Sequence, residues 1–96
     1  MRVVVSARAY ADLQDIFLFI AGKDPSAAER VVSDINRRYA YLAGFPYLGR
    51  PWPDADFAIR RLVAGSYLIF YREETTRLVI LRVLDGRMDV EAELLK

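Results

Sequence analysis

The stretch that decides the fold runs from Phe57 to Asp85 and reads FAIRRLVAGSYLIFYREETTRLVILRVLD. β-Branched and aromatic residues dominate it, and these side chains fit the pleated surface of a sheet. The strings AGS and EETT interrupt the run, and small and polar residues of this kind are typical of tight turns. We therefore predict antiparallel strands joined by two such turns.

The last of these strands has the strongest apolar character. From Leu78 to Val83 it is apolar at odd and even positions alike, apart from Arg82. Since side chains alternate between faces, such a strand is covered on both faces, and we place it at the centre of the sheet. We expect a helical hairpin on one face and a short acidic C-terminal helix, within 88–96, on the other. A half-buried guanidinium at Arg82 needs a partner, for which we expect Asp89 or another C-terminal acid.

The N-terminal half predicts a short strand followed by two helices. A β-branched run at 2–5 ends at Ser6, which suits a helix N-cap. Apolar residues then recur every three or four positions as far as Gly22, as in an amphipathic helix. An Asp-Pro step begins a second helix, whose left-handed C-cap we place at Gly44. The link between the helices is short, so they should form an antiparallel hairpin.

The segment 45–56 separates the helices from the hairpin strands. It contains three prolines and a glycine, so we predict an irregular loop there. The order of elements predicts one α+β domain over residues 1–96. In it, the N-terminal strand joins an edge of a small antiparallel sheet, the helical hairpin packs on that sheet, and a short helix ends the chain.

Composition excludes several kinds of chemistry. The sequence has no cysteine and no histidine, so it offers neither a thiolate nucleophile nor an ordinary neutral-pH proton shuttle. We expect no cofactor, no metal and no catalytic residue. No apolar run approaches the length of a membrane span or signal peptide, so we expect a cytoplasmic protein without a membrane partner. The net charge is only +1, which favours no non-specific binding to nucleic acid.

Arginine supplies almost all of the positive charge, since lysine occurs only at 23 and 96. Arginine is suited to bidentate contacts with carboxylates or phosphates. Side chains alternate along a strand, so Arg60 and Arg61 should point to opposite faces of the sheet. The alternative to a binding role for these arginines is ordinary pairing with carboxylates on neighbouring strands and turns.

Several strings resemble the ParE branch of the ParE/RelE superfamily of bacterial toxins. They are SARAYADLQDIFLFIA at 6–21, DPSAAERVV at 24–32, FPYLGR at 45–50, IRRLVAGSYLIFYR at 59–72 and ILRVLDGRMDVEAEL at 80–94. They stand in the family's order and at family-like spacings over almost the whole chain. The resemblance implies a helical hairpin packed on an antiparallel sheet, in agreement with the fold predicted above.

The resemblance also implies a function, the toxin half of a type II toxin–antitoxin system. ParE-like toxins inhibit DNA gyrase by stabilising cleaved DNA, and a cognate antitoxin wraps and neutralises them. The implied partners are therefore gyrase and a ParD-like antitoxin of the ribbon-helix-helix or a similar class. The complex would be a toxin–antitoxin hetero-oligomer that contacts operator DNA only through the antitoxin.

RelE-like relatives, which cut messenger RNA on the ribosome, are the first alternative. That cleavage needs closely grouped basic and acid–base side chains. Where RelE-like chains carry an arginine after the tyrosine of the second hairpin strand, this chain has Leu68 after Tyr67. The other basic positions correspond at best to Arg61 and Arg87, and guanidinium is a poor proton donor. We therefore predict no ribonuclease activity. A non-toxic module that only binds an antitoxin is the second alternative.

Two sets of residues are candidates for binding. The target-binding set lies on or just after the sheet strands, and the antitoxin-binding set lies on the outer side of the helical hairpin and in the loop. The alternative for the second set is that its members belong to the core. The target-binding candidates are Arg60, Arg61, Arg82, Arg87, Met88 and Asp89, and the antitoxin-binding candidates are Tyr10, Leu18, Tyr41 and Trp52.

Overall fold

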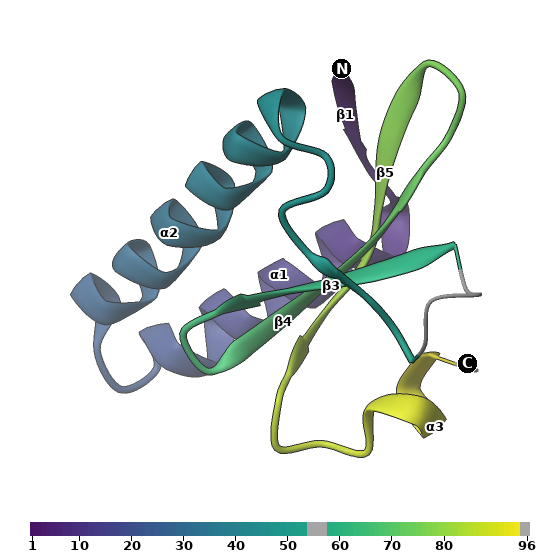
Figure 1. The fold of residues 1–96 in the computed structure, drawn as a ribbon. Coiled ribbons are helices and arrows are strands. Elements are labelled where there is room, and N and C mark those ends of the chain that lie inside the picture. The colour runs from purple at the N-terminus through teal and green to yellow at the C-terminus, as the bar shows by residue number, and fades with distance from the viewer. Residues whose placement is uncertain (54–57, 95–96) are drawn as a thin grey trace.

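The elements follow the predicted order (Figure 1) in a computed structural model that describes residues 1–53 and 58–94. The predicted strand start at Phe57, the last part of the predicted loop at 54–56, and residues 95–96 lie outside the described residues. The elements are β1 (Arg2–Val5), α1 (Ala7–Ala21), α2 (Pro25–Gly44), β2 (Arg50–Pro51), β3 (Ile59–Ala64), β4 (Tyr67–Glu73), β5 (Arg77–Asp85) and α3 (Val90–Leu94).

The strands form one five-stranded sheet in the order β1-β5-β4-β3-β2. The pairs β3–β4 and β4–β5 are antiparallel, as expected for a chain that turns back at Gly65 and again after β4. β1 lies at the predicted edge but runs parallel to β5, so the sheet is antiparallel except at that edge. The short strand β2 lies within the predicted loop and pairs with β3 at the opposite edge.

The two long helices form the predicted antiparallel hairpin beside the sheet (Figure 1). The Ser6 hydroxyl accepts a hydrogen bond from the Ala9 amide at 3.1 Å, which makes Ser6 the N-cap of α1. The predicted left-handed cap at Gly44 is wrong, because Gly44 is the last residue of α2 and the C-cap is Phe45, whose φ is −136°. Phe45 precedes a proline, and a residue in that position favours extended backbone.

The main core lies between the helical hairpin and one face of the sheet. It contains small residues where the helices approach, such as Ala9, and large ones on the strands. Because its members come from every long element, the core holds the hairpin and sheet together. The buried members of this cluster are Ala9, Ile35, Tyr39, Leu42, Ala64, Ile69, Tyr71, Leu78, Ile80 and Val83.

A β-bulge in β5 explains the position of Arg82. Tyr71 pairs with Ile80 and Phe70 with Arg82, so Leu81 is an extra residue in the ladder. The bulge shifts the face that meets the helices from even positions, as at Ile80, to the odd position Val83. Arg82 therefore lies on the face of the sheet that does not meet the helices, in the same row as Phe70.

The opposite face of the sheet is also covered, as predicted for the strand that became β5. Phe70 is fully buried there, and Trp52 packs against it edge-on, with ring centroids 5.2 Å apart. A hydrogen bond joins α3 to β5, in which Arg82 Nη1 donates to the Glu93 carbonyl at 2.7 Å. No helix in the described part of the chain is long and apolar enough to cross a membrane.

Candidate binding surfaces

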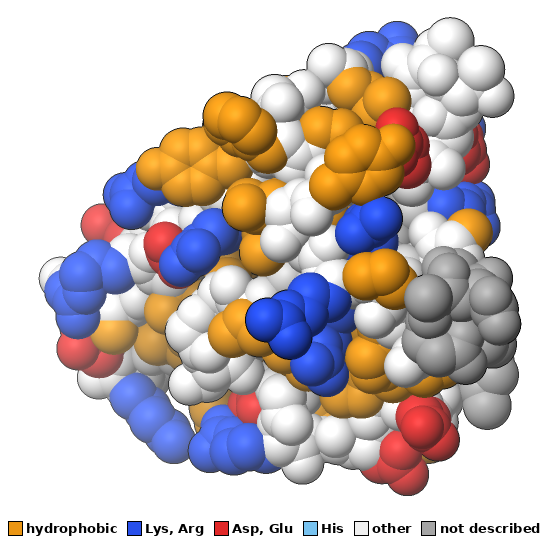
Figure 2. Space-filling view, viewed as in Figure 1, with side chains coloured by type: hydrophobic (Ala, Val, Ile, Leu, Met, Phe, Trp, Pro, Cys, Tyr) orange, Lys and Arg blue, Asp and Glu red, His pale blue; other side chains and the backbone are white. Residues whose placement is uncertain are grey.

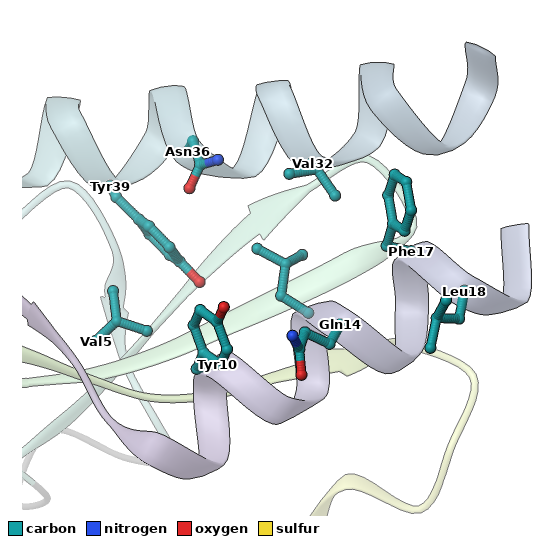
Figure 3. A pocket seen from close by; sticks show the side chains of 9 residues that line it. Val5, Tyr10, Gln14, Phe17, Leu18, Val32, Asn36 and Tyr39 are labelled. Atoms are coloured by element: carbon teal, nitrogen blue, oxygen red, sulfur yellow. The ribbon is translucent and has the colours of Figure 1, made fainter. Parts of the chain in front are cut away.

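The first candidate surface is an apolar groove between α1 and α2, which we call the hairpin groove. It has a volume of about 680 Å³. Side chains from both helices form its walls, and Figure 3 shows Tyr10 of α1 and Tyr39 of α2 pointing toward one another. None of its described lining residues carries a formal charge. They are Val5, Tyr10, Leu13, Gln14, Phe17, Leu18, Val32, Asn36 and Tyr39.

The hairpin groove contains two of the predicted antitoxin-binding residues, Tyr10 and Leu18. Their side chains are 62% and 68% exposed, so they belong to the surface and not to the core. Trp52 lies elsewhere, on the far face of the sheet against Phe70, which agrees with the alternative that it covers the core. Tyr41 is exposed but does not line the groove. The structure thus brings together only half of the predicted set.

A further apolar patch extends over the end of α2 and the loop that follows it. In the view of Figure 2, hydrophobic side chains gather over this part of the molecule, next to basic ones. Its exposed members include Tyr41, Phe45, Tyr47 and Leu48. Tyr41 therefore belongs to a surface adjoining the loop.

The second groove, which we call the Arg82 groove, lies between α1, the end of β5 and the residues after it. Its volume is about 300 Å³. It contains two of the predicted target-binding residues, Arg82 and Met88, and five of its described lining residues are charged. Its lining residues are Asp12, Asp15, Ile16, Phe19, Tyr67, Arg82, Val83, Leu84, Asp85, Met88 and Glu93.

Asp12 of α1 is the main partner of Arg82, so the predicted pairing with Asp89 is wrong. The alternative, another C-terminal acid, is confirmed in a secondary role, because the Glu93 carboxylate lies 3.9 Å from Arg82 Nη2. Arg82 donates from Nε to Asp12 Oδ2 at 2.7 Å and from Nη2 to Oδ1 at 2.9 Å. Asp12 Oδ2 also accepts from the Val83 amide at 3.0 Å. The hydrogen bonds to Asp12 raise the pKa of Arg82. Asp89 instead accepts from the Ala92 amide at the start of α3.

The pairing follows from where β1 ends. The β1–β5 ladder stops at Val5 and Ile80, and α1 then borders the edge of β5. This places the Asp12 carboxylate at a strand amide that has no neighbouring strand on that side. One acid therefore satisfies both an edge amide and a guanidinium.

Arg87 lies just beyond β5 and pairs with Asp85. Its Nη2 donates to Asp85 Oδ2 at 2.7 Å, and its own amide donates to Oδ1 at 2.9 Å. The Arg87 side chain is 83% exposed, so the pair lies at the surface. The hydrogen bonds from Arg87 hold the pKa of Asp85 at about 2, below its ordinary value of 3.8.

This lowered pKa predicts acid sensitivity that depends on Asp85. A carboxyl whose pKa is lower in the folded state stabilises the fold above its unfolded pKa and loses that effect as pH falls through the folded value. Asp85→Asn should therefore be less stable than the natural chain at pH 6, and the difference should shrink between about pH 4 and pH 2. Urea denaturation over this pH range measures it. A difference that stays constant with pH would contradict the assignment.

Arg60 and Arg61 point to opposite faces, as predicted. Arg60 lies opposite Tyr71, on the face that meets the helices, and Arg61 lies opposite Phe70, on the other face. Arg60 Nη1 donates to the Gly49 carbonyl at 2.8 Å, and its guanidinium lies 4.7 Å from the centre of the Tyr47 ring. Arg60 therefore holds the loop before β2, away from the Arg82 groove.

A family model described as the ParE toxin of the type II toxin–antitoxin system, parDE, matches residues 3–90. The chain belongs to the ParE toxin family. Toxin ParE3 of Caulobacter vibrioides is 30% identical over 94 residues, which cover 97% of this chain and 94% of that protein.

Solved structures confirm the ParE/RelE-like fold. A structure described as the chromosomal ParDE toxin–antitoxin system from P. aeruginosa matches with a TM-score of 0.77 and 23% identity. A chain of the RelBE2 toxin–antitoxin complex from Mycobacterium tuberculosis matches with a TM-score of 0.60 and 25% identity. In both comparisons, the match covers 88% of this chain and 95% of the other.

The structure also brings residues into the Arg82 groove that the sequence interpretation missed. Phe19 is 67% exposed, lines the Arg82 groove and has Lys23 Nζ 4.7 Å from its ring centre. Asp12, Ile16 and Phe19 follow one another at four- and three-residue spacing, so they share one face of α1. This spacing could have identified Asp12, Ile16 and Phe19 as one surface from the sequence alone. No group of residues able to hold a metal ion occurs within 1–53 and 58–94.

Proposed function

We propose that this ParE-family toxin inhibits DNA gyrase by protein–protein binding and that a cognate antitoxin neutralises it by docking in the hairpin groove. The family match over residues 3–90 is the observation that carries the proposal. Inhibition of gyrase is the activity that the ParE resemblance implies. A toxin with that target acts in the cytoplasm, and it would reach operator DNA only through its antitoxin.

The positions of the basic residues favour inhibition over RNA cleavage. Leu68, at the position where RelE-like chains carry an arginine, is paired with Leu84. Arg61 pairs with Phe70 of β4. Arg87 lies beyond Asp85, which pairs with Tyr67, and Tyr67 is three residues from Phe70 along β4. Three positions correspond to roughly 10 Å along a strand. Closely grouped basic and acid–base side chains are what cleavage requires, so this separation supports a binding mechanism.

The hairpin groove has the features of a docking site for an antitoxin segment. Its walls are mainly apolar, its described lining residues are uncharged, and Tyr10 and Leu18, which line it, are exposed. Burial of apolar surface in such a groove stabilises a complex, as when an amphipathic helix lies in a hydrophobic groove. The two structural relatives are described as parts of toxin–antitoxin systems, which supports a partner of this class.

The Arg82 groove is our candidate for the gyrase-binding surface. Its exposed members include the predicted residue Met88 and the ring of Phe19, whereas the predicted residue Arg82 is buried and bound to Asp12. Aromatic side chains are enriched among the residues that dominate binding at protein interfaces. Arg87 and Asp89 adjoin this groove in sequence, whereas Arg60 and Arg61 lie on β3.

Leu18 and Phe19 provide a matched test of the two surfaces. They are neighbours on α1 and almost equally exposed, but they line different grooves. Leu18→Glu should weaken antitoxin binding at least about tenfold, because it places an unpaired carboxylate against an apolar partner. Calorimetric titration of the toxin with its antitoxin measures this effect. Phe19→Glu should leave antitoxin binding within about twofold and weaken gyrase inhibition instead. Equal effects of the two changes on antitoxin affinity would contradict the separation of the surfaces.

Expression without antitoxin tests the activity in cells. Growth should stop and the DNA-damage response should be induced, because stabilised cleaved DNA blocks replication. Co-expression of the antitoxin should restore growth. Normal growth without antitoxin would favour the alternative of a non-toxic antitoxin-binding module. The RelE-like alternative would be favoured if the protein cleaved messenger RNA on ribosomes and if Arg61→Ala with Arg87→Ala abolished that cleavage.

A further inference from the structure

The hydroxyl of Tyr39 is unusual among the buried polar groups of this chain. The side chain lies on α2 and is only 8% exposed. Its Oη is buried and has no hydrogen-bond partner among the described residues. Figure 3 shows the ring reaching from α2 into the hairpin groove, with the hydroxyl directed toward the side chains of α1. The one orphaned hydroxyl of the described residues therefore lies in the wall of the proposed antitoxin site.

Tyr71 shows how the same fold treats a buried tyrosine with an internal role. Its hydroxyl donates to the Pro46 carbonyl at 2.8 Å and accepts from the Gly49 amide at 2.8 Å. Buried polar groups in native proteins are nearly always paired in this way, because an unpaired one loses its bonds to water without replacement. The Tyr39 side chain lines the groove, so a segment that docks there and displaces the side chains covering the hydroxyl can supply the missing partner.

We propose that Tyr39 is a specificity-determining residue of the antitoxin site, whose hydroxyl donates a hydrogen bond to an uncharged acceptor on the docked antitoxin segment. The acceptor would be a carboxamide, hydroxyl or free carbonyl oxygen. The proposal rests on antitoxin docking in the hairpin groove. It adds that the buried face of the antitoxin is apolar except at the point that meets Tyr39.

The surroundings explain why the acceptor is uncharged. The groove has no cation among its described lining residues, so a carboxylate buried at Tyr39 would lack a compensating charge. Burial, and to a smaller extent the nearby Asp12 carboxylate, raise the pKa of Tyr39. The hydroxyl therefore stays protonated and acts as a donor. Elsewhere in the groove, Val5, Leu13 and Phe17 offer only apolar contacts.

Tyr39→Phe tests the proposal because it removes the hydroxyl and keeps the ring. Antitoxin affinity, measured by titration with the full-length cognate antitoxin, should fall about tenfold, since the acceptor on the antitoxin loses its partner. The free toxin, freed from antitoxin by denaturation and refolding, should be as stable as the natural chain or more stable. Losing an unpaired buried hydroxyl removes a desolvation cost.

Tyr47→Phe is the matched control. Tyr47 lies outside the hairpin groove, in the loop after α2, and is 67% exposed, so water can satisfy its hydroxyl. This change should leave antitoxin affinity within about twofold of the natural chain and the stability of the free toxin unchanged. A matching loss of affinity in Tyr47→Phe would show that removal of any tyrosine hydroxyl has the same effect, and it would overturn the special role of Tyr39.

The remaining outcomes separate this inference from the proposed function. If Tyr39→Phe binds antitoxin as tightly as the natural chain while Leu18→Glu binds weakly, docking in the groove stands and the role of the hydroxyl is overturned. If Tyr39→Phe destabilises the free toxin, the hydroxyl has an internal structural role and the proposal also fails. If the natural chain does not bind its cognate antitoxin, the proposed function fails, and this inference fails with it.

Discussion

Asp12→Ala should lower the free energy of unfolding by about 3 to 5 kcal/mol, the range expected when one partner of a buried ion pair is removed. The Arg82 and Asp12 side chains are only 11% and 14% exposed. Without the carboxylate, the guanidinium loses both bonds to Asp12, and the Val83 amide loses its acceptor at the edge of β5. Urea denaturation of the purified full-length chain measures the difference.

Asp15→Ala is the control for this change. Asp15 lies on the same helix and is exposed, so its replacement should change stability by no more than about 0.5 kcal/mol. The double variant Asp12→Leu with Arg82→Met should lose less stability than the sum of the single changes, since it leaves no unpaired charge. If Asp12→Ala is as stable as Asp15→Ala, the pair is not a structural element of the fold.

Gly49→Ala should destabilise the fold by about 2 to 3 kcal/mol, as expected for forced overpacking. A Cβ at this position would lie 2.8 Å from the Tyr71 ring and hydroxyl and 2.9 Å from the Arg61 carbonyl. The ring is fully buried and the carbonyl belongs to a strand, so neither can move away at little cost. The change would also disturb the hydrogen bond from the Gly49 amide to Tyr71.

Gly44→Ala is the matched glycine control. Nothing lies within 4 Å of the position that its Cβ would take, and Gly44 is the last residue of α2. Alanine there should leave stability unchanged or raise it by about 0.5 to 1 kcal/mol, because alanine loses less conformational entropy in a helix. Equal stability of Gly44→Ala and Gly49→Ala would show that the loop is not fixed against Tyr71.

Local patterns predicted the elements of the fold, because helix and strand periodicity depend on residues close in sequence. The caps at Ser6 and Asp24 and the turn at Gly65 are local in the same sense. The β5 bulge was not predictable in this way, because its extra residue is defined only by pairing with β4. The parallel direction of β1 likewise depends on how the hairpin crosses the sheet.

The candidate sites were harder to predict for the same reason. Asp12 and Arg82 are 70 residues apart, and only the end of β1 brings them together. Tyr10 and Leu18 could be placed on the outer side of the hairpin from helical spacing alone. The buried, unpartnered state of the Tyr39 hydroxyl depends on the packing of α2 against α1 and the sheet. Spacing predicts which face a residue occupies but not which hydrogen bonds it makes.

DNA cleavage by purified gyrase is the most direct test of gyrase inhibition by this toxin. Toxin freed from its antitoxin should cause gyrase to accumulate cleaved plasmid DNA as its concentration rises, and added antitoxin should reverse the effect. Phe19→Glu should require a higher concentration for the same cleavage. If supercoiling and cleavage in the presence of the free, folded toxin are the same as with gyrase alone, gyrase is not its target.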